Sequence, residues 1–198
     1  MDTRLIVLSL LALVAASCNT VQGNNRTGDT APDDAAMQEP TFPPESGVHG
    51  GSIVSDGLER TFQIDIPSEY DGASEMPLLL VFHGGGGSGE RLKGRLGFGR
   101  AAEPNGAIVV YPDGIESNWA DGRGTTDASQ AGVDDVAFVS DLIDHLDAHL
   151  SIDATRIWAT GVSNGGIFSH RLACDLADRL AAVGPVIAAF PTEYKDDC

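Results

Sequence analysis

The fold is decided by residues 156–166, which read RIWATGVSNGG. Residues 156–160 are predicted as a strand, and residues 164–176 have the apolar spacing of a helix. Because so few residues connect the two elements, the chain must turn sharply, and the flanking positions cannot carry bulky side chains. Gly161 and Gly165 meet that requirement. The stretch therefore predicts a strand, a tight turn and a helix that packs closely against the strand.

Outward from this turn, strands and helices alternate along the chain. Expected strands cover residues 51–55, 60–66, 77–82, 107–111 and 182–188, and expected helices cover residues 91–103 and 134–149. The run 77–82, PLLLVF, is continuously apolar, as in a strand buried on both faces of a parallel sheet. Asp56 and Gly57 form a hairpin signal between the first two strands. The alternation predicts an α/β fold, with a mainly parallel sheet and helices on both faces.

Composition and charge limit the classes of function. The chain has 198 residues, of which 42% are hydrophobic, a fraction near the globular average. It holds 29 Asp and Glu against 12 Lys and Arg, for a formal net charge of −17. Nucleic-acid binding requires clustered Lys and Arg, so we expect no nucleic-acid partner. The same negative charge argues against adsorption to anionic lipid.

The N-terminus has the features of an export signal. Residues 5–16, LIVLSLLALVAA, form an apolar run after Arg4 that is shorter than the about 20 residues needed to span a bilayer. The small residues before Cys18 resemble a bacterial lipoprotein signal, although Ala15 stands where such signals usually have Leu. We expect residues 1–18 to be a signal peptide with lipidation at Cys18; ordinary cleavage and a retained anchor are the alternatives. The protein is then secreted or extracytoplasmic, with a lipid anchor in the membrane if Cys18 is modified.

Residues 19–47 are rich in Asn, Thr, Asp, Pro and Gly and contain almost no large apolar side chain. Such a stretch cannot bury enough surface to offset the entropy lost on ordering. We therefore expect a disordered linker at 19–47, followed by the catalytic domain at 48–198.

Ser163 is the candidate nucleophile. It is the central residue of Gly161-Val162-Ser163-Asn164-Gly165, a G-x-S-x-G pattern between an expected strand and an expected helix. In that context the turn is a nucleophile elbow, which projects the Ser oxygen above the sheet over the N-terminus of the helix. Negative charge that develops there is stabilised by the helix dipole.

A second loop, residues 83–89 (HGGGGSG), directly follows a buried strand. It matches the HGGG type of loop, whose backbone N–H groups form part of an oxyanion hole in acyl transfer. Gly85 or Gly86 is expected to provide one donor, and Asn164, the residue after Ser163, the other. A purely structural turn is the alternative, whereas a phosphate loop is disfavoured because no Gly-Lys-Ser/Thr follows. The two loops together predict a serine hydrolase.

Several segments resemble the secreted polyhydroxybutyrate-depolymerase-like and feruloyl-esterase-like α/β-hydrolases. They are PLLLVFHGGGGSG, AIVVYPDG, NWADG, VDDVAFVSDLID and RIWATGVSNGGIFSHRLACDLADRLAAVGPV, within a match from about residue 60 to the C-terminus. The resemblance implies an α/β-hydrolase fold and a carboxylic ester hydrolase for polymeric or plant-wall (feruloyl or acetyl) esters, with Ser163 as the acylated nucleophile and no metal or organic cofactor. It also implies a Cys174–Cys198 disulfide, for which the loop-entropy model gives roughly 3–4 kcal/mol.

The acid and the His of a catalytic triad are not identified. In this fold both follow the nucleophile, but the last His of the chain, His170, is about 10 Å along the helix axis from Ser163. General-base catalysis needs about 3 Å, so His170 is rejected, and His83 is expected to orient the oxyanion loop. We therefore expect the domain to be incomplete at its C-terminus, as in a fragment of a longer enzyme. A catalytically defective module that binds carbohydrate or polyester, and a peptidase or acyltransferase on the same scaffold, are the alternatives.

Two further features have less distinctive interpretations. Trp119 lies in an expected irregular stretch at 115–132, near the strand ends where open α/β sheets bind ligands. Packing inside the loop is the favoured interpretation, and Trp119 is kept as a candidate for contact with the substrate. His145 and His149 are one helical turn apart, but their acidic neighbours indicate a solvated helix face, and no metal site is predicted.

Overall fold

A computed structural model describes residues 45–192 and residue 198. The predicted signal peptide at 1–18, the lipidation of Cys18 and most of the predicted linker lie outside the described residues. The first strand begins at Gly47, where the linker was expected to end. None of the helices in the described part is long and apolar enough to cross a membrane.

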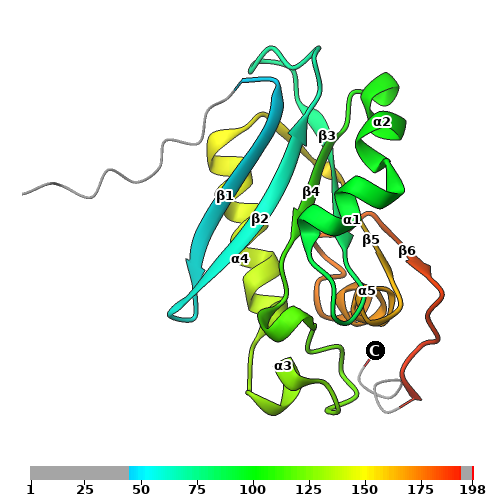
Figure 1. The fold of residues 1–198 in the computed structure, drawn as a ribbon. Coiled ribbons are helices and arrows are strands. Elements are labelled where there is room, and N and C mark those ends of the chain that lie inside the picture. Colours follow the sequence, from blue (N-terminus) through cyan, green and yellow to red (C-terminus); the bar gives the residue numbers. More distant parts are fainter. Residues whose placement is uncertain (1–44, 193–197) are drawn as a thin grey trace, which may run out of the picture. The chain divides into compact units, whose positions relative to one another are not determined.

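Six strands of the described residues form one sheet, in the order β1-β2-β4-β3-β5-β6. Their bounds are β1 (Gly47–Ser55), β2 (Leu58–Ile66), β3 (Met76–Phe82), β4 (Ile108–Pro112), β5 (Ile152–Val162) and β6 (Ala182–Val186). β2 pairs antiparallel with β1 and β4, whereas the pairs β4–β3, β3–β5 and β5–β6 are parallel (Figure 1). The predicted mainly parallel sheet is confirmed, with an antiparallel hairpin at one edge.

The hairpin between β1 and β2 turns at Asp56 and Gly57, whose φ angles are 49° and 74°. Positive φ at both central residues characterises the type I′ turn, which matches the twist of the flanking strands. Ser55 and Leu58 are paired directly before and after the turn. The Asp-Gly hairpin signal is therefore confirmed, although both strands are longer than predicted.

The helices are α1 (Gly89–Leu96), α2 (Phe98–Ala102), α3 (Asp127–Gln130), α4 (Asp135–His149) and α5 (Asn164–Asp175), with 3₁₀ helices η1 (Glu103–Asn105) and η2 (Ile115–Ser117). The prediction of one helix over 91–103 is wrong. Gly97 adopts a left-handed conformation, with φ of 61°, and ends α1 as its C-cap. The stretch 115–132, expected to be irregular, contains the short elements η2 and α3.

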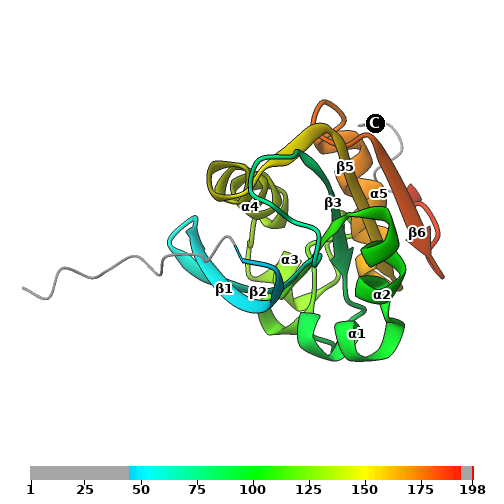
Figure 2. The ribbon, with the colours of Figure 1, turned by 90° about the horizontal axis from the view of Figure 1, so that it is seen from above.

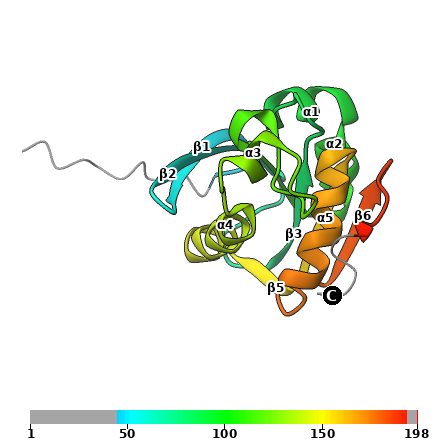
Figure 3. The same cartoon turned by 90° about the horizontal axis from the view of Figure 1, so that it is seen from below.

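Helices cover both faces of the sheet, as predicted. Figures 2 and 3 show α1 and α2 on one face and α4 and α5 on the other. The larger core lies under α4 and α5 and includes Phe138 and Phe168, which are wholly buried. The smaller core lies under α1 and α2 and includes Leu92 and Val81. β3 contributes to both cores, which explains its continuously apolar sequence.

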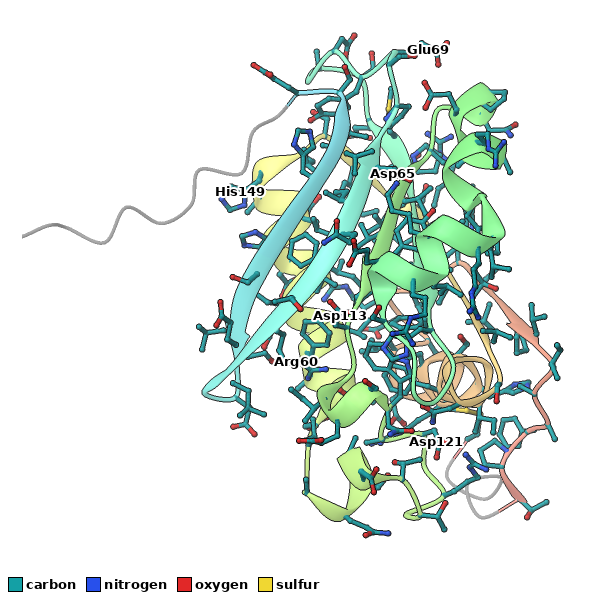
Figure 4. All side chains as sticks on the ribbon, viewed as in Figure 1. Arg60, Asp65, Glu69, Asp113, Asp121 and His149 are labelled. Atoms are coloured by element: carbon teal, nitrogen blue, oxygen red, sulfur yellow. A yellow bond between two sulfur atoms is a disulfide. The ribbon has the colours of Figure 1, made fainter. Side chains whose placement is uncertain are left out.

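A buried ion pair joins β2 to the start of α4. Arg60 Nη2 lies 2.5 Å from Asp135 Oδ1, and both side chains are almost fully inaccessible (Arg60 is labelled in Figure 4). The guanidinium also lies over the ring of Phe138, 3.8 Å from its centroid. Asp135 accepts the N–H of Ala120 at 2.7 Å. Burial raises the pKa of Asp135, and Arg60 and the Ala120 N–H oppose that effect. The pair thereby fixes the loop before α4 against the sheet.

β6 pairs with β5 and with no other described strand. Val186 in β6 exposes 45% of its surface, and Ile187, directly after it, exposes 84%. Folded proteins normally cover or charge the edges of their sheets. β6 is therefore an edge strand of the described sheet with exposed apolar residues at its carboxyl end, and it lies next to β5, which leads into Ser163.

A disulfide joins Cys174, near the end of α5, to Cys198. The two cysteines are separated by 24 positions in the sequence, and β6 lies between them. The pairing implied by the family resemblance is confirmed. A crosslink of this kind stabilises the fold chiefly by restricting the unfolded chain.

We expect the double variant Cys174→Ala/Cys198→Ala to lose about 3 kcal/mol of unfolding free energy, because the unfolded chain regains the entropy of the closed loop. Urea denaturation at constant pH measures the loss. Wild-type protein in excess dithiothreitol is the control and should match the double variant. Equal midpoints for the oxidised wild type and the double variant would contradict a stabilising crosslink.

Candidate active site

Ser163 occupies the sharp turn between β5 and α5. Its φ of 55° and ψ of −118° place a non-glycine residue in a sparsely populated backbone region. The Ser163 N–H donates to the carbonyl of Val186 at 3.0 Å, and the Ser163 carbonyl accepts from the N–H of Ile167 at 2.9 Å. The residue is exposed at the carboxyl end of β5. This geometry is that of the strained elbow that the G-x-S-x-G pattern predicts.

Two glycines allow α5 to lie this close to the sheet. A Cβ atom on Gly161 would lie 2.4 Å from the backbone of Gly165. A Cβ atom on Gly165 would lie 2.4 Å from the carbonyl oxygens of Phe82 and His83. These distances are well inside van der Waals contact. The first turn of α5 therefore packs directly on the ends of β3 and β5, and this contact sets the position of Ser163.

The glycine-rich loop at 83–89 runs beside the elbow. A Cβ atom on Gly84 would lie 3.5 Å from Ser163 Cβ, and one on Gly85 would lie 3.9 Å from Asn164 Cβ. Within the described part of the chain, the N–H groups of Gly85 and Asn164 have no hydrogen-bond acceptor. Both groups are therefore available to stabilise an oxyanion formed beside Ser163.

Gly86 does not fit the role of oxyanion donor. Its N–H donates to the carbonyl of Ser117 at 2.8 Å, and a donor held in this way is not available to an oxyanion. Ser117 and the preceding Glu116 have φ of 58° and 50°, which non-glycine residues rarely adopt. Backbone strain of this kind gathers at functional sites. Of the two glycines predicted as donors, Gly85 fits and Gly86 instead anchors the loop to η2.

His83 orients the glycine-rich loop through both of its ring nitrogens. Nε2 accepts the N–H of Gly114 at 3.0 Å, so the ring proton is on Nδ1, which donates to the carbonyl of Gly84 at 2.8 Å. The side chain is only 1% exposed. Burial is the main cause that lowers the pKa of His83 below its usual 6.5, and the ring is neutral. A histidine with both nitrogens engaged is a positioning residue and does not act as the base for Ser163.

Asp113 anchors the other end of the same loop, a role that the sequence did not reveal. Its Oδ1 accepts the N–H of Gly89 at 2.7 Å, and its Oδ2 accepts the Thr61 hydroxyl at 2.8 Å (Asp113 is labelled in Figure 4). In the sequence, Asp113 lies just after the expected strand at 107–111 and directly before a glycine. A carboxylate that follows a strand and faces the first turn of a nearby helix is the signal that could have found it.

The side chain of Asn164 ties the elbow to the loop after η2. Its Oδ1 accepts the N–H of Trp119 at 2.9 Å, and its Nδ2 donates to Asp121 Oδ2 at 2.7 Å. Asp121 is wholly buried and also pairs with Arg123 at 2.6 Å (Figure 4). These bonds fix the residue whose backbone N–H is the second candidate oxyanion donor.

Trp119 lies in the core and not at the surface. The residue is 0% exposed, and its Nε1–H donates to the carbonyl of His83 at 2.9 Å. The indole stacks on Phe168 with a centroid distance of 5.2 Å and an interplanar angle of 2°. The structure therefore supports loop packing and corrects the interpretation of Trp119 as a residue that faces the substrate.

No histidine of the described residues is hydrogen-bonded to Ser163. His170 packs its ring against Phe190, at a centroid distance of 5.2 Å, and His83 is engaged as described. Within residues 45–192 and 198, no group of His, Cys, Asp and Glu could hold a metal ion. The described site thus contains a candidate nucleophile, Ser163, and two candidate oxyanion donors, the N–H groups of Gly85 and Asn164.

The chain is similar in sequence to feruloyl esterases. It is 34% identical to feruloyl esterase B of Piromyces equi over 141 residues, which cover 69% of this chain and 25% of that protein. It is 30% identical to feruloyl esterase C of Emericella nidulans over 130 residues, which cover 63% of this chain and 44% of that protein. It is 25% identical to feruloyl esterase D of Neurospora crassa over 199 residues, which cover 93% of this chain and 59% of that protein. The chain thus spans between 25% and 59% of the length of these relatives. No family model matches the chain.

Solved structures share the fold. The feruloyl esterase module from Clostridium thermocellum superposes with a TM-score of 0.61 at 15% identity, covering 75% of this chain and 56% of that module. The acetyl xylan esterase from Aspergillus awamori superposes with a TM-score of 0.56 at 17% identity, covering 68% of this chain and 50% of that enzyme. The chain therefore has the predicted α/β-hydrolase fold.

The pKa of His83 predicts how stability depends on pH. Because the folded state binds the imidazole proton more weakly than the unfolded state, the unfolding free energy falls as the pH drops below about 6.5. We expect His83→Gln to be about 1–3 kcal/mol less stable at pH 7.5, through its lost hydrogen bonds, and to show a smaller further loss at pH 5.0. Urea denaturation at both pH values measures this difference.

The exposed His149 provides the matched control, since His149→Gln should retain the wild-type dependence on pH. An unchanged pH dependence in His83→Gln would contradict a buried, neutral His83.

Proposed function

The chain belongs to the feruloyl-esterase-like α/β-hydrolases, and we propose that it is a serine carboxylic ester hydrolase that acts on plant-wall esters. The observation that carries the proposal is the exposed, strained Ser163 beside two unoccupied backbone donors, the N–H groups of Gly85 and Asn164. A nucleophile and an oxyanion hole in this arrangement are what acyl transfer requires.

In the proposed reaction, Ser163 Oγ attacks the ester carbonyl and gives up its proton to a general base. The carbonyl oxygen becomes an alkoxide and accepts hydrogen bonds from the N–H groups of Gly85 and Asn164. The carbon–oxygen bond of the ester then breaks, and the leaving alcohol takes the proton back from the base. Water hydrolyses the acyl-enzyme by the same steps, releasing the acid and regenerating Ser163.

In the proposed reaction, the general base comes from outside the described residues. In the α/β-hydrolase fold, the acid and the His follow the nucleophile in the chain. The relatives are longer than this chain. Tests of activity therefore use the product of the whole reading frame that contains these 198 residues.

The similarity to known esterases supports the proposed substrate class. They include feruloyl esterases and a bifunctional acetylxylan esterase and xylanase of Neocallimastix patriciarum. Feruloyl and acetyl esters of plant-wall polysaccharide are therefore the first candidates. The resemblance to polyhydroxybutyrate depolymerases supports polyester as the second candidate.

We also propose that the protein is exported. The apolar run at 5–16 and the small residues before Cys18 support a signal peptide, with lipidation at Cys18 as the finer hypothesis. The Cys174–Cys198 disulfide agrees with an oxidising compartment. Metabolic labelling with a fatty-acid analogue would be lost in Cys18→Ala if Cys18 is the lipidation site.

A fluorophosphonate probe tests the nucleophile. We expect the wild type to be labelled at Ser163, and Ser163→Ala to lose both labelling and at least about 10³-fold in kcat/KM for p-nitrophenyl acetate. Ser151→Ala, at the opposite end of β5, is the matched control and should keep both signals. A wild type that is not labelled would favour the alternative, a catalytically defective module that binds carbohydrate or polyester.

A panel of three esters tests the substrate class. We expect release of acid from p-nitrophenyl acetate and methyl ferulate, because the relatives include a feruloyl esterase and an acetylxylan esterase, and little product from a polyhydroxybutyrate film. Chromatography of the released acids is the measurement, with Ser163→Ala as the blank. Product from the polyester film alone would reverse the order of the two candidates, and amide cleavage without ester cleavage would replace the esterase with a peptidase.

A further inference from the structure

Helix α1 carries two arginines beside the candidate active site that form no ion pair with any described residue. Arg91 and Arg95 are four residues apart, so they lie on the same face of the helix, and both are exposed. Like charges at this spacing destabilise a helix slightly. Arg95 lies in the last turn of α1, where the helix dipole favours a cation, whereas Arg91 lies nearer the N-terminus of the helix, where a cation is disfavoured.

Arg91 and Arg95 line a pocket of about 210 Å³. The glycine-rich loop, Leu92 and Val162 line the same pocket. Val162 directly precedes Ser163, and the Gly84 backbone lies against Ser163, so the pocket adjoins the elbow. No acidic residue lines it.

The positive charge of the pocket is not neutralised by the described residues. Six other cationic side chains form ion pairs, whereas Arg91, Arg95 and Arg100 form none. Arg91 Nη1 donates to the carbonyl of Gly86 at 3.1 Å. That bond uses one of five N–H donors and directs the guanidinium to the rim of the oxyanion loop. The loop thus positions Arg91, whereas Arg95 has no hydrogen bond or ion pair with its side chain among the described residues.

We infer that this pocket binds a carboxylate, and that the preferred substrate is an ester that carries an acidic group near the bond to be cleaved. The inference rests on the proposed esterase function and deepens it. Paired guanidinium groups bind carboxylates through planar, charge-assisted hydrogen bonds. Since the rest of the protein is strongly negative and repels anions, a local cationic pocket is what an acidic substrate would require. The carboxylate belongs either to a uronic acid on the alcohol side of the ester or to a half-ester on the acyl side.

Binding measurements test the inference without depending on catalysis. The probes are D-glucuronate for the alcohol side and monomethyl succinate for the acyl side, with D-glucose and methyl butyrate as their neutral counterparts. Saturation-transfer NMR at low ionic strength gives the affinities. We expect at least one carboxylate to bind more tightly than its neutral counterpart, and Arg95→Gln to weaken that binding about fivefold.

Arg100→Gln is the matched control, because Arg100 is an exposed arginine without an ion pair that lies outside the pocket. It should leave the affinity of the carboxylate unchanged. Equal loss in Arg95→Gln and Arg100→Gln would indicate a general charge effect and overturn the inference. Carboxylates that bind no better than the neutral probes would overturn it as well.

Different results would reject the esterase function and the carboxylate-binding pocket. Carboxylate binding that depends on Arg95, together with no fluorophosphonate labelling of Ser163, would keep the pocket and reject the esterase. Labelling of Ser163 without carboxylate binding would keep the esterase and reject the pocket. If both proposals hold, Arg95→Gln should raise KM for the acidic ester by a larger factor than KM for p-nitrophenyl acetate.

Discussion

The close contact between the first turn of α5 and the ends of β3 and β5 is the constraint on which the site depends. Side-chain atoms at positions 161 and 165 would lie 2.4 Å from backbone atoms, so the contact exists only because both residues are glycine. It bends the chain at Ser163 into a conformation with φ of 55° and leaves the side chain exposed above the sheet. The same contact brings Asn164 beside the glycine-rich loop.

The four glycines at 84–87 have no side chains to hold the loop in place, so flanking and neighbouring residues do so. His83 and Asp113 bond to the backbone at the two ends of the loop, and Gly86 is bonded to Ser117. Asn164 is bonded to the loop that carries Trp119. The cost of burying these polar groups is offset because each has a partner. The two candidate oxyanion donors, the N–H groups of Gly85 and Asn164, are thus held in place without a ligand, which is the preorganisation that the proposed acyl transfer needs.

Charge is distributed unevenly in this acidic chain. Most of its cations in the described region are used in ion pairs, and one of them, Arg60, is buried with Asp135 at the base of the loop before α4. Such a buried pair adds little net stability but is costly to break, so it specifies one arrangement of the loop. Against that background, the two unpaired arginines of α1 stand directly beside the elbow, where they can affect which esters bind.

Local sequence determined much of this protein: the alternation of strands and helices, the Asp-Gly hairpin and the elbow at Ser163 all follow from periodicity and short-range sterics. The expectation of the Cys174–Cys198 disulfide rests on a family resemblance. Tertiary structure alone decided that the N–H of Gly85 is free while that of Gly86 is not, that His83 is neutral with its proton on Nδ1, and that Trp119 is buried. It also decided that Asp113 and Asp121 support the site. Each of these depends on a hydrogen-bond or packing partner tens of residues away, and the choice of such partners is made only when the sheet and its helices come together.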